Sequence, residues 1–255
     1  MSQTVNQQKI AQVYHLPFVS SFGGSAMNLL SPQAGEHILD IGCGTGEFIS
    51  QLNKLHVRAT GIDCSENMIE QARHQYPTLS FEQLNALNLP YYEQFDAVFS
   101  NATLHDIRPP HLVIKNIYNA LKPNGRFVAE FWGKGNMDEI FIEIIRQFKT
   151  FDIPYNDVDF PWYFPSVAEY SSLLESQNFQ VTTAIHYSRP LLLKGENGLR
   201  NWLETNAAPL FAHVTTETKN VLITRLENRM QDKLFQNGSW LAEAKHIRVH
   251  AVKRD

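Results

Sequence analysis

Three alternating glycines constrain this chain more than any other feature. The segment 37–41 is largely apolar and reads as a strand, and it runs directly into Gly42, Gly44 and Gly46. Glycine has no Cβ, so such a turn lets bare backbone approach a ligand closely, and it aims the free N–H groups of the next helix at that ligand. The pattern therefore predicts a strand, a nucleotide-sized gap and a helix over residues 46–55. Taken alone, the turn is equally compatible with a tight structural bend.

Two better-known glycine motifs do not fit this turn. A P-loop ends in Gly-Lys followed by Ser or Thr, whereas this turn continues with Gly46, Glu47 and Phe48. The dinucleotide-binding motif has its third glycine one position later. The acidic Glu47 also stands where a pyrophosphate would lie, which argues against an anionic ligand.

A carboxylate follows the next predicted strand, residues 59–62. Asp63 ends this strand, and in doubly wound sheets the acid at this place accepts hydrogen bonds from ribose hydroxyls. Together, Leu39-Asp-Ile-Gly-Cys-Gly-Thr-Gly46 and Gly61-Ile-Asp63-Cys-Ser-Glu-Asn-Met68 resemble the class I S-adenosylmethionine (SAM)-dependent methyltransferases. The pair of motifs is much more specific than either half.

This resemblance implies SAM as the cofactor and methyl transfer as the activity. It places the cofactor against residues that follow the first four strands: Gly42, Cys43, Gly44, Asp63, Cys64, Met68, Asn85, Ala86 and Asn101. In the family the position of Asn85 is usually an aspartate that meets the adenine amino group. The Asn85 side-chain carbonyl can still accept a hydrogen bond from that amine.

His105 is the candidate catalytic residue. It follows the predicted strand 95–100, at the end where ligands of open α/β sheets collect, and the resemblance places it at the mouth that the substrate enters. Histidines in such positions are also commonly structural, so His105 is either a packed side chain or a substrate contact and base. A base is needed only when the acceptor must lose a proton, and a carboxylate acceptor is already ionised.

Alternating strand and helix signals predict parallel β-α units with right-handed crossovers. Three helix starts carry local signals: Ser65 as an N-cap, Pro109-Pro110 in a first turn, and the capping box Ser166-Val-Ala-Glu169. Further strands are expected at 79–83, 126–132, 179–187 and 246–253, and a helical cap at 196–236. The resemblance implies a doubly wound, Rossmann-like, mostly parallel seven-stranded sheet, with the helical cap inserted before an antiparallel last strand.

We expect a single domain over residues 1–255, with N-terminal cap helices in 1–30, a cofactor-binding core in 31–135, and substrate-side cap helices and closing strands in 136–255. Tyr14 and His15 are candidate contacts of the first segment with the cofactor. The segment 151–165 is rich in aromatic residues. It forms either a lid or pocket wall, or a plug of rings between a helix and the sheet.

The composition and net charge of the chain limit the classes of partner that it is expected to bind. Hydrophobic residues make up 43% of the chain and charged residues 19%, and the net charge is −4 without any lysine or arginine run, so we expect no nucleic-acid partner. We expect no membrane span and no signal peptide, and hence a cytoplasmic protein. Cys43 and Cys64 are interpreted as packed residues, with a redox role as the alternative. No metal-ligand spacing and no Gly-x-Ser-x-Gly motif occurs in the sequence.

The leading hypothesis is SAM-dependent transfer of a methyl group to a small-molecule acceptor. Leu121-Lys-Pro-Asn-Gly-Arg-Phe-Val-Ala-Glu130 and Phe164-Pro-Ser-Val-Ala-Glu-Tyr170 resemble the trans-aconitate methyltransferase-like branch, which brings carboxylates among the candidate acceptors. One alternative is a non-catalytic SAM-binding or regulatory module, since fold does not settle function. A protein methyltransferase is the other.

Overall fold

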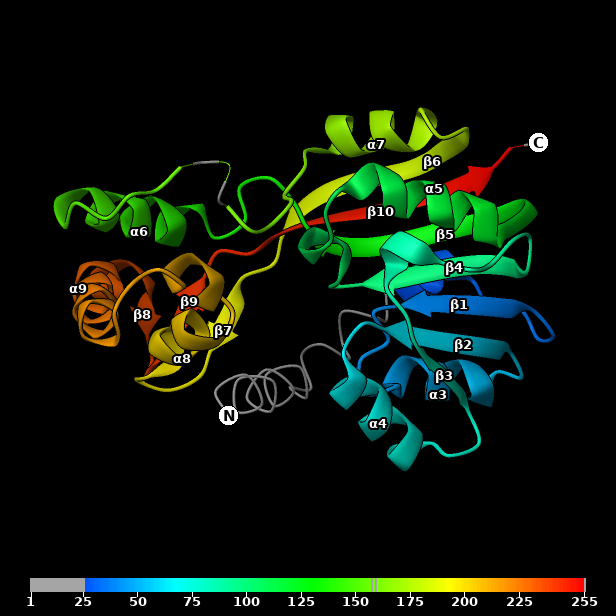
Figure 1. Ribbon diagram of the computed structural model, residues 1–255, viewed down its shortest axis with the longest axis horizontal. Helices are drawn as coiled ribbons and strands as arrows, with labels where there is room; N and C mark the ends of the chain where they lie inside the picture. The colour runs from blue at the N-terminus through cyan, green and yellow to red at the C-terminus, as the bar shows by residue number, and fades with distance from the viewer. Residues whose placement is uncertain (1–25, 157, 159, 255) are drawn as a thin grey trace. The chain divides into compact units, whose positions relative to one another are not determined.

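Seven strands form one mixed sheet in the order β3-β2-β1-β4-β5-β10-β6 (Figure 1). The computed structural model describes residues 26–156, 158 and 160–254. The strands are β1 His37–Ile41, β2 Arg58–Asp63, β3 Ser80–Gln83, β4 Phe95–Asn101, β5 Leu121–Trp132, β6 Phe179–Ser188 and β10 Lys245–Lys253. The parallel pairs are β1–β2, β1–β4, β2–β3 and β4–β5. β10 is antiparallel to β5. The predicted doubly wound, mostly parallel sheet is confirmed.

Helices connect the parallel strands and cover both faces of the sheet. They are α3 Glu47–Lys54, α4 Glu66–Gln75, α5 Pro110–Ala120 and α7 Val167–Glu175. The Ser65 side chain caps α4 by accepting a hydrogen bond from the Met68 N–H, and the predicted capping box at Ser166 and Glu169 begins α7. These caps satisfy N–H groups that the first turn of a helix leaves without intrahelical partners.

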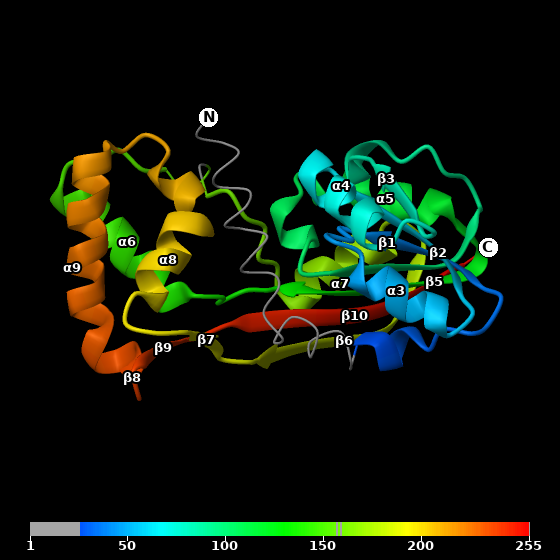
Figure 2. The ribbon, with the colours of Figure 1, turned by 90° about the horizontal axis from the view of Figure 1, so that it is seen from below.

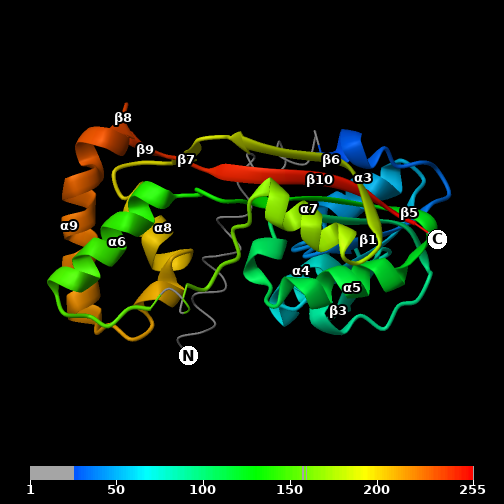
Figure 3. The ribbon, with the colours of Figure 1, turned by 90° about the horizontal axis from the view of Figure 1, so that it is seen from above.

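One core cluster lies under α5 and α7, which Figure 3 shows next to each other along the sheet. It joins inward residues of β1, β4, β5 and β10 to Val113, Ile117 and Tyr170. Leu52 of α3 packs on the opposite face with Ile38, while Ile69 of α4 belongs to a third cluster with Cys43 and Phe81. The sheet is therefore buried on both faces, as parallel sheets require.

The chain folds into two compact units. We call residues 26–134, 163–186 and 246–254 the sheet unit, and residues 135–162 and 187–245 the helical unit. Tyr14 and His15 lie outside the described residues. The single-domain arrangement with its three segments stays a prediction.

Three α-helices and a small sheet build the described part of the helical unit. α6 Asp138–Thr150, α8 Gly198–Thr205 and α9 Thr216–Leu234 are visible together in Figure 2. A three-stranded sheet joins β7 Leu191–Leu193, β9 Ser239–Ala242 and β8 Phe235–Gln236. The predicted helical cap is confirmed at α8 and α9. The prediction that helix continues to residue 236 was wrong, since residues 235–236 form a strand. Strands this short show no alternation that a sequence pattern can detect.

The aromatic segment before α7 packs on protein. Phe160 and Trp162 contact the Phe141 ring of α6, with ring centroids 5.2 and 5.3 Å apart. In the sheet unit, Tyr163 packs on Tyr170, at 6.5 Å between centroids. These contacts support the interpretation of these rings as packing elements.

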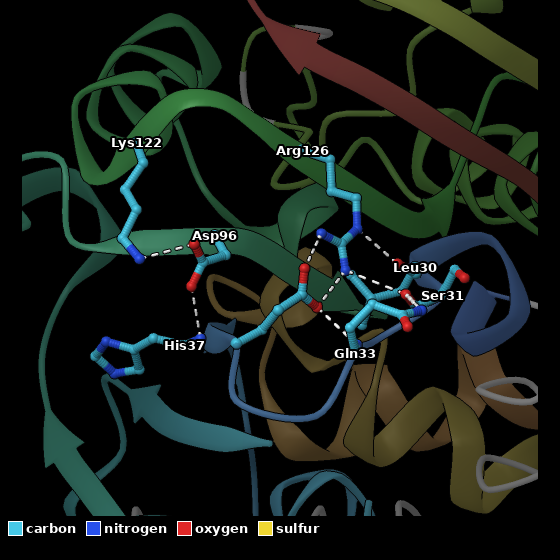
Figure 4. Close-up of polar contacts among 8 residues, drawn as sticks. Leu30, Ser31, Gln33, His37, Asp96, Lys122 and Arg126 are labelled. Carbon is cyan, nitrogen blue, oxygen red and sulfur yellow. Dashed lines mark hydrogen bonds and ion pairs between the residues drawn. The ribbon is translucent and has the colours of Figure 1, made fainter. Parts of the chain in front are cut away.

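A polar network fastens the loop before β1 to the sheet (Figure 4). The Arg126 guanidinium donates to both carboxylate oxygens of Glu36, at 2.7 Å each, and to the carbonyls of Leu30 and Ser31. Burial raises the pKa of Glu36, but the Arg126 hydrogen bonds and charge outweigh it, so that its pKa is lowered. This network lies at the amino end of β1, opposite the glycine turn.

Candidate active site

The site is assembled at the carboxyl ends of three adjacent strands. Ile41 at the end of β1 pairs with Ile62 of β2 on one side and with Ser100 of β4 on the other. The backbone N–H groups of Gly42 and Cys43 both donate to the Ile62 carbonyl, at 2.8 and 3.0 Å. The strand order alone therefore brings the glycine turn between the two other predicted site segments.

Asp63 directly contacts the glycine turn. Its Oδ2 accepts a hydrogen bond from the Gly44 N–H at 3.2 Å, and its Oδ1 accepts one from the Ser65 N–H at 2.9 Å. Burial raises the pKa of Asp63, although the backbone N–H groups of Ser65 and Gly44 oppose the rise. The two halves of the sequence motif thus meet in space, as predicted.

The three glycines of the turn have different reasons to be glycine. A Cβ on Gly42 would lie 2.0 Å from Thr103 Oγ1, and one on Gly46 would lie 2.6 Å from the Phe81 ring. A Cβ on Gly44 would meet no atom of the described residues within 4 Å, although its φ of +55° still disfavours other residues. The space that a side chain would occupy is therefore filled by Thr103 at Gly42 and by Phe81 at Gly46. The backbone of the turn as a cofactor contact stays a prediction.

A buried carboxylate beneath the turn was missed in the sequence analysis. Asp40 on β1 is 3% exposed, and burial, followed by the charge of Asp63, raises its pKa to about 8. Asp40 interrupts an otherwise apolar run, His-Ile-Leu-Asp-Ile, and this was the signal that could have revealed it. A cationic ligand above the turn would favour the ionised form of this carboxyl group.

The two cysteines are free thiols with different surroundings. Cys43 is buried against Gly61, and burial, reinforced by Asp40 and Asp63, raises its pKa. Cys64 is exposed at the surface, and partial desolvation by neighbouring atoms, followed by the charges of Asp63 and Asp106, raises the pKa of its thiol. Raised pKa values keep both thiols protonated and unreactive, which counts against a redox role. The packing interpretation fits Cys43 and was wrong for Cys64, whose side chain is exposed.

Three further predicted residues lie after β2 and β3. The Met68 N–H donates to Ser65 Oγ at 3.4 Å, so Met68 belongs to the first turn of α4. The Asn85 side chain is exposed, and its Oδ1 accepts a hydrogen bond from the Leu87 N–H at 2.9 Å, which begins the short helix η1 Ala86–Asn88. A carbonyl oxygen has two lone pairs, so this Oδ1 retains acceptor capacity. Ala86 is buried.

The segment after β4 bends sharply. Ala102 has a left-handed φ of +55°, and its N–H donates to the Glu130 carbonyl of β5 at 2.7 Å. Thr103 Oγ1 donates to the Asn101 carbonyl, which holds the threonine over Gly42. A non-glycine residue in this conformation is strained, and such strain clusters at functional sites. Thr103 has no sequence signal, because its role depends on the tertiary contact.

His105 is buried among rings. It lies on η2 Leu104–Asp106, is 1% exposed, and has its ring centroid 4.4 Å from Trp132 and 6.2 Å from Phe164. Burial lowers the pKa of His105 to about 3, so the imidazole is neutral at physiological pH. A neutral imidazole can accept a proton, and packing alone would also explain the position.

The carboxyl groups around the turn suit a cation, which would favour the ionised form of Asp40. Asp40 and Asp63 lie beside the glycine turn, and Glu47 accepts hydrogen bonds from the Thr45 hydroxyl at the start of α3. An open approach at Gly44 and a carboxylate held against it fit an adenosine-bearing sulfonium. Among the described residues, no group of three or more His, Cys, Asp or Glu side chains is arranged to hold a metal ion.

Comparison with known proteins decides the family. A model of the methyltransferase domain matches residues 32–161. An uncharacterised methyltransferase of Schizosaccharomyces pombe is 31% identical over 247 residues, which cover 92% of this chain and 94% of the relative. The chain belongs to the SAM-dependent methyltransferases. Its cofactor is SAM, and it is an enzyme.

Other methyltransferases are similar over smaller parts or at lower identity. The O-methyltransferase resE of Aspergillus sclerotiorum is 35% identical over 105 residues, which cover 38% of this chain and 40% of that one. The structure of phosphoethanolamine N-methyltransferase 2 of Haemonchus contortus with SAM has a TM-score of 0.55 and 19% identity, and covers 91% of this chain and 52% of that one. At this identity the structural likeness concerns the fold.

The described helices of the methyltransferase do not meet the requirements of a membrane span. Over the residues described above, none is both long enough and apolar enough to cross a bilayer.

Proposed function

We propose that this methyltransferase transfers the methyl group of SAM to a small-molecule acceptor in the cytoplasm. The cofactor would be held by Gly42, Cys43, Gly44, Asp63, Cys64, Met68, Asn85, Ala86 and Asn101. The observation that carries this assignment is the Asp63 carboxylate held against the Gly44 N–H. An acid at this place, beside a turn with open space at Gly44, is suited to grip ribose hydroxyls.

When bound, SAM would supply an electrophilic methyl group on a sulfonium, and the acceptor would attack this methyl carbon in line with the departing sulfur. The protein's own contribution is to align the acceptor and to exclude water, and alignment alone is worth on the order of 7–11 kcal/mol. Asp63 would orient the sugar, and the Asn85 carbonyl would accept a hydrogen bond from the adenine amine. His105 would contact the acceptor and take its proton when the acceptor has one to lose.

Two classes of acceptor, a carboxylate and a flat ring compound, are the finer proposals. The trans-aconitate-like motifs favour a carboxylate, which needs no base. O-methyltransferases of fungi and demethylmenaquinone methyltransferases of bacteria are relatives over about two fifths of this chain, and their names point to other acceptors. The aromatic surroundings of His105 favour a flat acceptor over a free carboxylate.

Incubation with methyl-labelled SAM and a metabolite extract tests the proposal. We expect label in small products. Label in proteins would favour a protein methyltransferase instead, and SAM binding without any transfer across broad extracts would favour a regulatory module. The net charge of −4 makes nucleic acid the least expected recipient of label.

A further inference from the structure

The proposed base lies beside a carboxylate that reaches solvent. His105 Nε2 is 3.6 Å from Asp106 Oδ2, and the side chains of the two residues are 1% and 47% exposed. Both residues belong to η2, so this short helix directs the imidazole inward and keeps the neighbouring carboxylate at the surface. The His105 imidazole is therefore buried, while the Asp106 carboxylate beside it is in contact with solvent.

The two nitrogens of the imidazole have different surroundings. Nε2 faces the Asp106 carboxylate, whereas Nδ1 is buried and finds no hydrogen-bond partner among the described residues. A carboxylate accepts hydrogen bonds, so it favours the tautomer that carries the proton on Nε2 and leaves a lone pair on Nδ1. A distance of 3.6 Å exceeds that of a hydrogen bond, but catalytic contacts are commonly long before ligands bind.

A protonated His105 needs a counter-charge. Trp132 and Phe164 surround the ring with apolar surface, and burial lowers the pKa of His105 to about 3. A desolvated imidazolium is unfavourable unless an opposite charge lies close by. The Asp106 carboxylate lies 3.6 Å from Nε2, beyond hydrogen-bond distance, and does not offset the effect of burial in the ligand-free protein, so a shorter contact is required when the acceptor is bound.

We propose that Asp106 is a positioning residue that holds the Nε2 proton of His105, so that Nδ1 accepts the proton of an acceptor that arrives as an un-ionised ring hydroxyl, a phenol or enol. This inference rests on the proposed role of His105. The acceptor oxygen uses a lone pair for the new C–O bond, and the C–S pair stays on sulfur. The bonding electrons of the O–H bond stay on the acceptor oxygen as its proton moves to Nδ1 of His105. Water takes the proton from Nδ1 once the product has left.

A carboxylate acceptor fits the same surroundings poorly. It carries no proton for His105 to accept, and it would approach an edge where two carboxylates are already present. Asp63 and Asp106 both raise the pKa of the Cys64 thiol, which places both charges within reach of one exposed side chain. Like charges repel, so these two carboxylates oppose the approach of a third.

The tautomer of His105 tests the pairing without any acceptor. We would record nitrogen NMR spectra of the full chain labelled at histidine, with the His105→Gln variant to identify the signals. The expected result is a proton on Nε2 in the wild type and a mixture of tautomers in Asp106→Asn. Glu70→Gln, an exposed acid on α4, is the matched control and should leave the tautomer unchanged. A wild-type proton on Nδ1 would overturn the pairing.

Labelled SAM and a panel of phenols of graded acidity, each with its matching benzoate, test the acceptor class. We expect label in phenols, and a kcat that Asp106→Asn lowers by about a hundredfold or more with little change in KM. The loss should be greatest for the least acidic phenols, and Asp106→Glu should restore part of the rate. Label in benzoates, or in no phenol at all, would overturn the acceptor class.

Calorimetry with SAM keeps this inference separate from the proposed function. Asp106→Asn should bind SAM as the wild type does. If wild-type SAM binding does not depend on Asp63, the proposed cofactor site fails, whereas the tautomer measurement still decides the role of Asp106.

Discussion

Asp63 is the residue whose removal should affect the cofactor most. Asp63→Ala deletes the acceptor for ribose hydroxyls and releases the Gly44 N–H, so we expect SAM affinity to fall by about 10- to 100-fold, since a hydrogen bond to a charged group is worth about 1.5–3 kcal/mol. Calorimetric titration measures this. Glu70→Ala, an exposed acid on the next helix, is the control. Equal affinity of Asp63→Ala and the wild type would refute the ribose assignment.

The turn glycines should separate into a structural and a ligand-facing position. Gly42→Ala places a Cβ 2.0 Å from Thr103, so it should destabilise the fold by more than the roughly 1–2 kcal/mol expected from a left-handed φ alone. Gly44→Ala should cost only that strain but weaken SAM binding. Gly35→Ala, with a φ of +88° and open space, is the strain control. Chemical denaturation and calorimetry measure both effects, and similar destabilisation by Gly42→Ala and Gly35→Ala would contradict the steric argument.

Asp40 should make the ligand-free protein lose stability as pH rises. The pKa of Asp40 in the folded protein, about 8, lies above the ordinary value of 3.8. The stability that protonated Asp40 contributes is therefore fully present below about pH 4 and is lost as pH rises through 8. Asp40→Asn cannot ionise, and we expect its free energy of unfolding to vary less over this range and to exceed the wild-type value above pH 8. Urea titrations at several pH values check this. Parallel pH curves for the two proteins would show that Asp40 does not titrate as stated.

At the scale of elements, Arg126 joins β5 to the loop before β1. Arg126→Met leaves the Glu36 carboxylate, which is 18% exposed, with the Gln33 N–H as a donor but without the guanidinium, and we expect a loss of about 2–3 kcal/mol in the free energy of unfolding. The pKa of Glu36 is lowered in the folded state, so the wild-type advantage should shrink as pH falls through that lowered pKa. Urea denaturation is the measurement. Arg58→Met, an exposed arginine on β2, should cost much less.

Elements with local signals were predictable from the sequence. Ser65 and the Ser166 capping box marked two helix starts, and the apolar run into Gly42 marked β1. β5 was predicted from Arg126, whereas it begins at Leu121, where pairing with Phe95 precedes a shift in register. That pairing depends on a neighbouring strand and leaves no trace in the local pattern.

The candidate site shows the same division. The meeting of Asp63 with the glycine turn followed from motif order, because parallel strands end at one edge of a sheet. The burial of Asp40 and the position of Thr103 over Gly42 depend on contacts between elements, and no local period encodes such contacts.

At the scale of the whole molecule, SAM should protect one of the two units. The proposed cofactor residues all belong to the sheet unit, so SAM at a hundred times its Kd should stabilise that unit by about 2.7 kcal/mol. Hydrogen exchange should slow in β1, β2 and β4 and change little in α9. Asp63→Ala should lack the protection at the same SAM concentration. Uniform protection of both units would indicate that the chain unfolds as a single cooperative body.

The place of β10 has a consequence for synthesis. This strand follows all the others along the chain, yet it lies between β5 and β6. During synthesis, the edge of β5 that pairs with β10 therefore stays unpaired until residues 245–253 emerge from the ribosome. Unpaired strand edges are templates for aggregation. Ribosome-stalled chains that end before Lys245 should accordingly be digested by protease much faster than chains extended beyond the exit tunnel. Until residues 245–253 have left the tunnel, the unpaired edge of β5 is open to association with other nascent chains.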